Sequence, residues 1–149
     1  MNLLRTPARL LCLLTVLLAA GRLGAAERAT VTLLSTTDMH GHIAPYDYYS
    51  DKPAEYGLAK ISTLVKQVRK DSPAALLLDC GDTIQGTPLV YFHNRANNTP
   101  VDPMMLVMNA MGYAAMTIGN HEYNFGLSVL NKARGEADRK STRLNSSHT

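Results

Sequence analysis

Apolar residues in this chain gather in short runs that alternate with stretches of helical periodicity. The runs Thr30–Thr37, Ala74–Leu78 and Ala114–Ile118 are rich in β-branched and aliphatic residues and are short enough to be strands. The first run, TVTLLSTT, is apolar at successive positions, so we predict a strand that is buried on both faces and not an amphipathic edge strand. The order of the runs and the helical stretches predicts an α/β domain with a parallel sheet.

Helical stretches separate the three predicted strands. Their bounds follow from helical spacing of apolar residues, from Thr-Pro and Asp-Pro starts, and from a closing glycine at Gly112. Four methionines in the third stretch are predicted to fill the core, and not to form a metal or cofactor site. The segment Ala44–Glu55, rich in Tyr, Asp and Pro, is predicted to be a long loop. The predicted helices are Gly57–Arg69, Thr87–Arg95, Asp102–Met111 and Leu127–Arg134.

A polar loop follows each predicted strand. These loops are TTDMHGH at Thr36–His42, DCGDTIQG at Asp79–Gly86 and GNHEYNFG at Gly119–Gly126. In open parallel sheets, ligands bind at the carboxyl ends of the strands. We therefore predict that the three loops assemble into one site.

The first 26 residues have the composition of a targeting segment. Arg5 and Arg9 precede an apolar run at Leu10–Ala20, and small residues lie just before Glu27. This layout predicts a secretory signal peptide at residues 1–26, cleaved after Ala26, with no stable membrane anchor afterwards and a periplasmic or secreted product. The alternative is a membrane anchor, but the apolar run is about half of the ~20 residues that a spanning helix needs.

The last twelve residues, 138–149, have no apolar periodicity, and their polar residues form no pattern of helix caps. Their string DRKSTRLNSSH resembles the translation of a short sequencing adapter, so we predict that residues 138–149 are an artefact. A natural, polar and disordered tail is the alternative. On the first interpretation the chain is a fragment, and its genuine sequence ends near Ala137.

The positive net charge comes from the two ends of the chain. The whole sequence has 15 Lys and Arg against 12 Asp and Glu, a formal charge of +3. Residues 27–137 alone hold 9 basic and 11 acidic side chains, a formal charge of −2. Electrostatics therefore gives no support to a nucleic-acid polymer as partner.

Four side chains in the three loops offer oxygen or imidazole nitrogen ligands without thiolates: Asp38, His40, Asp82 and Asn120. This mixture suits Mn, Zn, Fe or Co at a catalytic site better than a closed structural zinc site. Asp82, in the middle loop, is the candidate to bridge two ions roughly 3.5–4 Å apart, an arrangement that promotes in-line displacement at phosphorus. His121, next to a ligand, is predicted to stabilise the transition state or protonate the leaving oxygen.

Each of these residues has a simpler structural explanation when it is considered alone. Asp38 and Asp82 could cap a turn or helix, and His40, His42 or His93 could be a surface or core histidine. The combination, with ligand-type groups in all three loops, favours the metal site.

The three motifs resemble the first three motifs of the calcineurin-like metallophosphoesterases, in the same order. Together with the predicted signal peptide, they are similar to the secreted 5′-nucleotidases and 2′,3′-cyclic-nucleotide 2′-phosphodiesterase/3′-nucleotidases. The resemblance implies that residues 27–137 are the N-terminal part of a catalytic domain. That domain would be a four-layer α/β/β/α sandwich, incomplete here, with two divalent metal ions whose identity the sequence does not give.

The resemblance also implies a role for each matching residue. Asp38 and His40 would hold the first metal, Asp82 would bridge, Asn120 would bind the second metal and the phosphate, and His121 would be the catalytic histidine that contacts the substrate. Family members have further metal-binding histidine motifs and a carboxy-terminal domain that holds the base between aromatic rings. We expect both to lie beyond this fragment, so the fragment itself is expected to be inactive.

Asn124 is the informative departure from the family pattern. Many 5′-nucleotidases carry aspartate at the corresponding position, where it supports the catalytic histidine. Asparagine here, with the loop Tyr46–Tyr49, is more similar to the cyclic-phosphodiesterase/3′-nucleotidase branch, and Asn124 is assigned with His121 to the catalytic group. The predicted function is metal-dependent hydrolysis of phosphoesters in small extracytoplasmic nucleotides. The alternatives are a 5′-nucleotidase or UDP-sugar hydrolase, a sulfur-oxidation thiohydrolase relative, and a non-catalytic secreted binding protein.

Overall fold

Three parallel strands form the sheet of the computed structural model, which describes residues 28–137. They are β1 (Leu33–Thr36), β4 (Leu76–Asp79) and β5 (Ala115–Met116), in the spatial order β1-β4-β5. The register pairs Leu33 with Leu76 and Leu78 with Ala115. The prediction of a parallel-sheet α/β arrangement is confirmed. The predicted signal peptide (1–26) and adapter-derived tail (138–149) lie outside the described residues.

All four predicted helices are present, with bounds within two residues of the predicted ones. They are α2 (Leu58–Asp71), α3 (Pro88–Arg95), α4 (Pro103–Met111) and α5 (Leu127–Glu136), and a 3-10 turn, η1 (His121–Tyr123), precedes α5. Within residues 28–137, no helix has the length and apolar character needed to cross a membrane.

The predicted long loop contains a short antiparallel hairpin, β2 (Tyr46–Asp47) and β3 (Lys52–Pro53). The Asp47 carboxylate closes its turn by accepting hydrogen bonds from the Tyr49 amide at 2.9 Å and the Ser50 hydroxyl at 2.6 Å. Strands of two residues leave no detectable alternation in the sequence, which is why the pattern did not reveal them.

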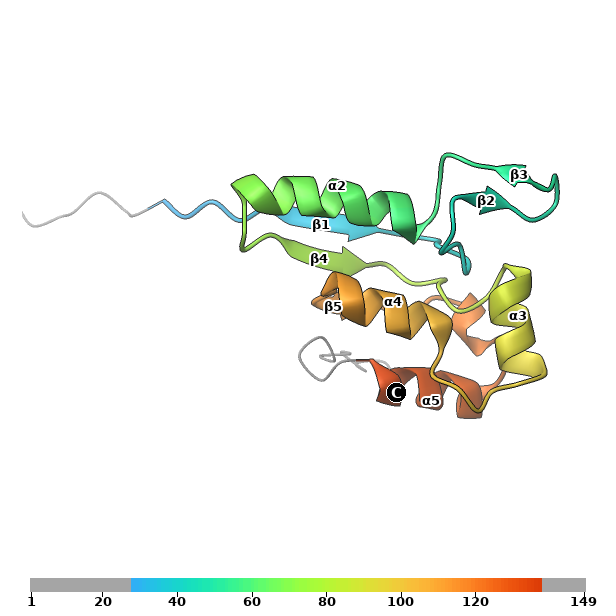
Figure 1. Ribbon diagram of the computed structural model, residues 1–149. Helices are drawn as coiled ribbons and strands as arrows, with labels where there is room; N and C mark the ends of the chain where they lie inside the picture. The colour runs from blue at the N-terminus through green and yellow to red at the C-terminus, as the bar shows by residue number, and fades with distance from the viewer. Residues whose placement is uncertain (1–27, 138–149) are drawn as a thin grey trace, which may run out of the picture. The chain divides into compact units, whose positions relative to one another are not determined.

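The core lies on one face of the sheet, under α2 and α4. Arg69 of α2 donates hydrogen bonds to the carbonyl oxygens of Met111 at 2.6 Å and Gly112 at 3.0 Å, so the two helices lie side by side. Figure 1 shows both helices over the strands. The predicted core methionines are all buried, at 0–8 % exposure: Met104, Met105, Met108 and Met111.

The opposite face of the sheet is open, which contradicts one prediction. We expected β1 to be buried on both faces, but Leu33 is 61 % exposed and Leu76 on β4 is 44 % exposed. The sequence pattern correctly predicted an apolar strand here. Nothing in the described part of the chain covers its second face.

Helix termini hold the loops in place. Asp102 caps α4 as predicted, since one carboxylate oxygen accepts from the Met104 amide at 2.8 Å and the Met105 amide at 3.2 Å. Thr87 occupies the N-cap position of α3, but the expected capping hydrogen bond is not made. Its hydroxyl instead donates to the Gly41 carbonyl at 3.0 Å and ties α3 to the loop after β1.

Candidate metal centre and active site

The loops after β1 and β4 extend the pairing of these two strands beyond the sheet. The Asp38 amide donates to the Gly81 carbonyl at 3.1 Å, and the His40 amide donates to the Asp82 carbonyl at 2.9 Å. A Cβ added at Gly86 would lie 2.2 Å from the His40 carbonyl oxygen, so only glycine permits this close contact. The two loops therefore advance side by side from the carboxyl ends of their strands.

Three of the predicted metal ligands have left-handed backbone conformations. The φ angles are 52° at Asp38, 44° at His40 and 60° at Asp82, and Asp51 in the hairpin is the other non-glycine residue with positive φ in the described part of the chain. This conformation costs an ordinary residue roughly 1 kcal/mol or more. Strain of this kind is concentrated at functional sites, where it orients a side chain that an unstrained backbone would direct elsewhere.

Side chains from all three loops converge on one point. His40, Asp82 and His121 each offer one ligand atom, and these atoms lie within 4.8 Å of one another. The imidazole rings of His40 and His121 meet edge to face, with centroids 5.2 Å apart. All three side chains are half-buried, and a donor set of two imidazoles and a carboxylate fits a divalent transition metal.

Asp38 and Asn120 border this cluster. Asp38 Oδ1 is 3.8 Å from Nε2 of His40, and its other oxygen accepts a hydrogen bond from the Thr37 hydroxyl. Asn120 is exposed directly before η1, where its carbonyl accepts from the Tyr123 amide at 3.3 Å. Both residues have side chains that a ligand could reach from solvent.

Gln85 orients the His40 ring. Nδ1 of His40 lies 3.2 Å from the Gln85 carbonyl oxygen and 3.3 Å from its side-chain oxygen. Both partners are acceptors, so Nδ1 carries the proton and Nε2 keeps a free lone pair for a metal. Gln85 belongs to the second of the three polar loops, but no local sequence pattern predicts its contact with His40.

Asn124 fixes the orientation of His121. Its side-chain nitrogen is 2.9 Å from Nδ1 of His121, and because an amide nitrogen can only donate, Nδ1 is the acceptor. The proton of a neutral ring is then on Nε2. In this form Nε2 of His121 is a hydrogen-bond donor and has no lone pair for a metal.

Glu122 is the important residue that we did not predict. It is 1 % exposed, and its carboxylate accepts hydrogen bonds from backbone amides of two different loops. The amides at 2.7 and 2.8 Å belong to Gly119 and Asp82. A glutamate after Asn-His gives no sequence signal for this role, because the Asp82 amide belongs to a loop about forty residues earlier in the chain.

A second buried carboxylate, Asp79, anchors the loop after β4 from below. It accepts hydrogen bonds from the hydroxyls of Thr36 at 2.5 Å and Thr83 at 2.8 Å and from the Gly81 amide at 2.9 Å. Burial raises the pKa of Asp79, and the three hydrogen bonds oppose that rise. The Thr36 hydroxyl also contacts Tyr113 at 3.0 Å, which completes a polar cluster under the site.

A groove of about 460 Å³ opens beside Asp38 and runs toward the start of α2. His42 and Tyr56 line it, with ring centroids 4.7 Å apart. Nδ1 of His42 is buried without a hydrogen-bond partner, and burial, with the neighbouring His40, lowers the pKa of this ring. Apolar and aromatic side chains form the walls of the groove, and the Lys60–Glu55 ion pair lies at its edge.

The sequence matches the family model described as Calcineurin-like phosphoesterase over residues 31–146. The chain belongs to the calcineurin-like phosphoesterases. The resemblance inferred from the three motifs is thereby confirmed, as is the prediction that the chain forms part of this fold. Membership in this metallophosphoesterase family implies the use of a divalent metal. Within the cluster, His40 and Asp82 provide suitable donors, and His121 lies beside them.

Relatives of this phosphoesterase chain include nucleotide-cleaving enzymes of bacteria. It is 41 % identical over 121 residues to the trifunctional nucleotide phosphoesterase protein YfkN of Bacillus subtilis, covering 76 % of this chain and 8 % of that protein. It is also 41 % identical over 113 residues to a 2′,3′-cyclic-nucleotide 2′-phosphodiesterase/3′-nucleotidase of Yersinia enterocolitica, covering 72 % of this chain and 17 % of that protein. The chain thus spans less than a fifth of the length of these relatives.

Solved structures show the same fold. The crystal structure of YfkN superimposes with a TM-score of 0.68 at 41 % identity, over 72 % of this phosphoesterase chain and 34 % of the YfkN chain. A putative 5′-nucleotidase from Staphylococcus aureus superimposes with a TM-score of 0.67 at 27 % identity, over 72 % of this chain and 21 % of that one.

Proposed function

We propose that the protein carrying this chain hydrolyses phosphoester bonds in small nucleotides with a dinuclear divalent metal centre. The observation that supports this most directly is the convergence of His40, Asp82 and His121 at the carboxyl ends of three parallel strands, with one ring nitrogen or carboxylate oxygen of each residue within 4.8 Å of the others. The proposed activity is that of the whole protein, of which this chain provides the first three motifs.

In this proposal Asp38 and His40 would hold one metal, Asp82 would be shared between the two metals, and Asn120 would hold the second metal and contact the phosphate. The free Nε2 of His40 and the exposed side chains of Asp38 and Asn120 are consistent with these roles. Mn, Zn, Fe and Co all suit such ligands. When bound, two such ions activate water and neutralise charge on the phosphoryl group.

His121 is the proposed catalytic residue, and Asn124 is its positioning residue. With the Asn124 amide nitrogen on Nδ1, the neutral His121 ring presents Nε2–H and can donate a hydrogen bond to a phosphoryl or leaving oxygen. Proton transfer requires the imidazolium, whose Nδ1–H needs an acceptor. Rotation of the Asn124 amide by half a turn supplies its oxygen for that purpose.

The proposed substrates are 2′,3′-cyclic nucleotides and 3′-nucleotides outside the cytoplasm. This choice is supported by asparagine at position 124 and by the similarity to the Yersinia enzyme. The second candidate is a 5′-nucleotidase, which the similarity to the Staphylococcus protein supports. A signal peptide at residues 1–26 and export remain part of the proposal, as does the exclusion of nucleic-acid polymers as substrates.

The test is an assay of the full-length protein with Mn²⁺ on AMP, 3′-AMP and 2′,3′-cyclic AMP, with and without a chelator. We expect chelator-sensitive hydrolysis that favours 2′,3′-cyclic AMP and 3′-AMP. A strong preference for AMP would select the 5′-nucleotidase candidate. Absence of metal-dependent hydrolysis of all three esters would overturn the enzyme proposal in favour of a binding protein.

A further inference from the structure

Glu122 connects the loop after β4 to the loop after β5 through a single carboxylate. One oxygen, Oε2, accepts from the Asp82 amide at 2.8 Å and from the Gly119 amide at 2.7 Å. The other oxygen, Oε1, accepts from the Thr83 amide at 2.5 Å and the Ile84 amide at 3.3 Å. Four backbone amides from two loops thus share one buried anion.

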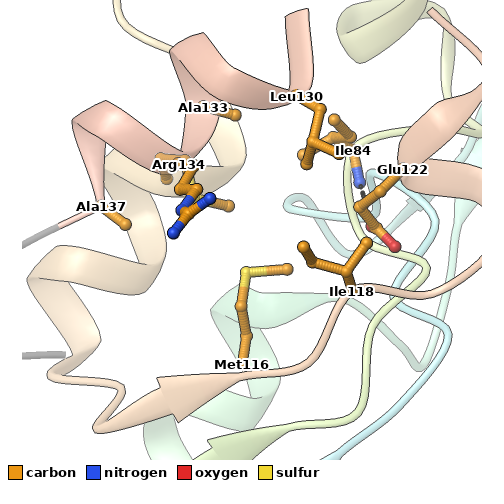
Figure 2. A pocket seen from close by; sticks show the side chains of 9 residues that line it. Ile84, Met116, Ile118, Glu122, Leu130, Ala133, Arg134 and Ala137 are labelled. Carbon is orange, nitrogen blue, oxygen red and sulfur yellow. Dashed lines mark hydrogen bonds between the residues drawn. The ribbon is translucent and has the colours of Figure 1, made fainter. Parts of the chain in front are cut away.

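The surroundings of Glu122 make these hydrogen bonds hard to replace. Figure 2 shows its side chain among Ile84, Ile118 and Leu130, which form the apolar wall of a small cavity. The ion pairs found within residues 28–137 do not include Glu122. Its charge is therefore stabilised by the four amides. Separating the two loops would leave the buried carboxylate with the Gly119 amide alone, and the loss of three donors is costly.

The two loops are also in direct backbone contact where Glu122 holds them. A Cβ at Gly81 would lie 2.5 Å from the Gly119 amide nitrogen, and a Cβ at Gly119 would lie 2.2 Å from Oδ1 of Asp82. The same Oδ1 accepts a hydrogen bond from the His121 amide at 2.8 Å. The orientation of the Asp82 carboxylate is thus set by the loop that carries His121, and Glu122 holds this contact closed.

We infer that Glu122 is a positioning residue that keeps Asp82 and the Asn120–His121 segment in register, so that a metal bound at Asp82 and a substrate contacted by His121 share one site. Glu122 itself has no exposed oxygen to offer a metal or a substrate. This inference rests on the proposed metal centre.

The test compares Glu122→Gln with wild type in the full-length protein by calorimetric titration with Mn²⁺, below the melting temperature of both. Glutamine keeps the shape but places an NH₂ group against two backbone amides. Loss of such outer-sphere support typically weakens metal binding by about 10- to 100-fold, and we expect a loss of that size. Asp102→Asn is the matched control, since Asp102 is an equally buried carboxylate that accepts backbone amides at α4, away from the site.

Weaker Mn²⁺ binding in Glu122→Gln, with wild-type binding in Asp102→Asn, would support the inference. Unchanged binding in Glu122→Gln, or an equal loss in both variants, would overturn it while leaving the metal centre intact. A wild-type protein that binds no Mn²⁺ would overturn the metal centre and this inference together. If Glu122→Gln does not fold, Glu122→Asp replaces it, because the shorter carboxylate cannot reach all four amides. Weaker or unchanged Mn²⁺ binding in Glu122→Asp then supports or overturns the inference in the same way.

Discussion

The two histidines of the candidate site differ in the hydrogen bonds of their ring nitrogens, and these hydrogen bonds indicate which chemical role each ring can have. His40 donates its Nδ1 proton to Gln85 and keeps Nε2 as a lone pair. His121 accepts at Nδ1 from Asn124 and keeps a proton on Nε2. Two histidines whose rings are in contact are thus prepared for opposite tasks, one to bind a metal and the other to donate a hydrogen bond.

Replacement of His121 tests this division. In the full-length protein, His121→Gln is expected to lower kcat by about 10²- to 10⁴-fold, the usual contribution of a general acid or base. Mn²⁺ affinity should stay near that of wild type, because His121 is not assigned to the metal. Steady-state kinetics and metal titration measure the two quantities. A large loss of Mn²⁺ affinity in this variant would instead make His121 a ligand.

Asn124→Asp tests how the imidazole is supported. A carboxylate at this position stabilises the imidazolium by charge, which an amide does not. We therefore expect the alkaline limb of the pH–rate profile to move to higher pH, with kcat at neutral pH equal to or above that of wild type. Asn124→Ala is the control, and its kcat should fall because the ring loses its orientation. A profile in Asn124→Asp that matches wild type would rule out a role for Asn124 in orienting His121.

At this scale the sequence identified candidate residues by their type, but it did not identify the partners of their side chains. Asp38, His40, Asp82, Asn120 and His121 were chosen because ligand-type groups recur after apolar strands, and the structure brings them to neighbouring loops. The contacts of Gln85 and Glu122 depend on which backbone atoms the fold brings near, and no local pattern encodes that. These two residues were accordingly missed.

Among the secondary-structure elements, helices were predictable and strands were less so. Helical spacing, proline at the first position and Gly112 after α4 gave bounds close to those observed, because these signals act within one turn. The exposed face of β1 was not predictable, since burial of a strand depends on what packs against it. The Thr87 hydroxyl was misassigned for a similar reason, because a tertiary acceptor at Gly41 replaced the local amide.

The cap of α4 offers a test at this scale. Asp102→Ala removes the acceptor of the Met104 and Met105 amides, and loss of an N-cap typically costs about 1–2 kcal/mol of unfolding free energy. Asp102→Asn retains an acceptor oxygen and should lose clearly less. Urea unfolding followed by circular dichroism measures both. Equal losses in the two variants would mean that the carboxylate charge matters and the cap does not.

In the whole molecule, a buried polar layer lies between the apolar core and the candidate ligand groups, which are half-buried or exposed. Asp79, Thr36 and Tyr113 lie in that layer, beneath the loops that carry the candidate ligands. The α/β class and the position of the site at the strand ends were predictable, because both follow from the order of elements along the chain. The extent of the domain was not predictable, because the sequence pattern does not identify the segments that pack on the second face of the sheet.

The pH dependence of stability follows from buried carboxylates. Burial raises the pKa of Asp102 above its ordinary value of 3.8, so the folded chain keeps this proton to higher pH than the unfolded chain does. The stability that this group contributes is complete below pH 3.8 and is lost as the pH rises through the folded pKa. In Asp102→Asn the loss disappears. The unfolding free energy of the variant, relative to that of wild type, should therefore rise from pH 3.5 to pH 7 in urea titrations. The expected rise is about 1.4 kcal/mol for each unit by which folding raises the pKa of Asp102. A difference that stays constant with pH would contradict this prediction.

Metal binding should stabilise the whole fold if the three loops form one centre. A ligand present at 100 times its dissociation constant adds about 2.7 kcal/mol of unfolding free energy. We expect Mn²⁺ to raise the melting temperature of the full-length protein and EDTA to reverse the rise. Asp82→Asn, which weakens the proposed bridge, should respond less. A melting temperature that does not change with Mn²⁺ would indicate that the ligands are not part of a preformed site.

The left-handed backbone conformation at Asp38, His40 and Asp82 creates a conflict between the stability of the fold and the activity of the site. Glycine at any of these positions would relax the local conformation while removing a proposed ligand. A deep mutational scan should thus rank glycine as tolerated or favourable at the three positions when protein abundance is selected, and as deleterious when turnover is selected. Engineers who seek a more robust enzyme of this family by easing backbone strain would first alter the residues that they most need to keep.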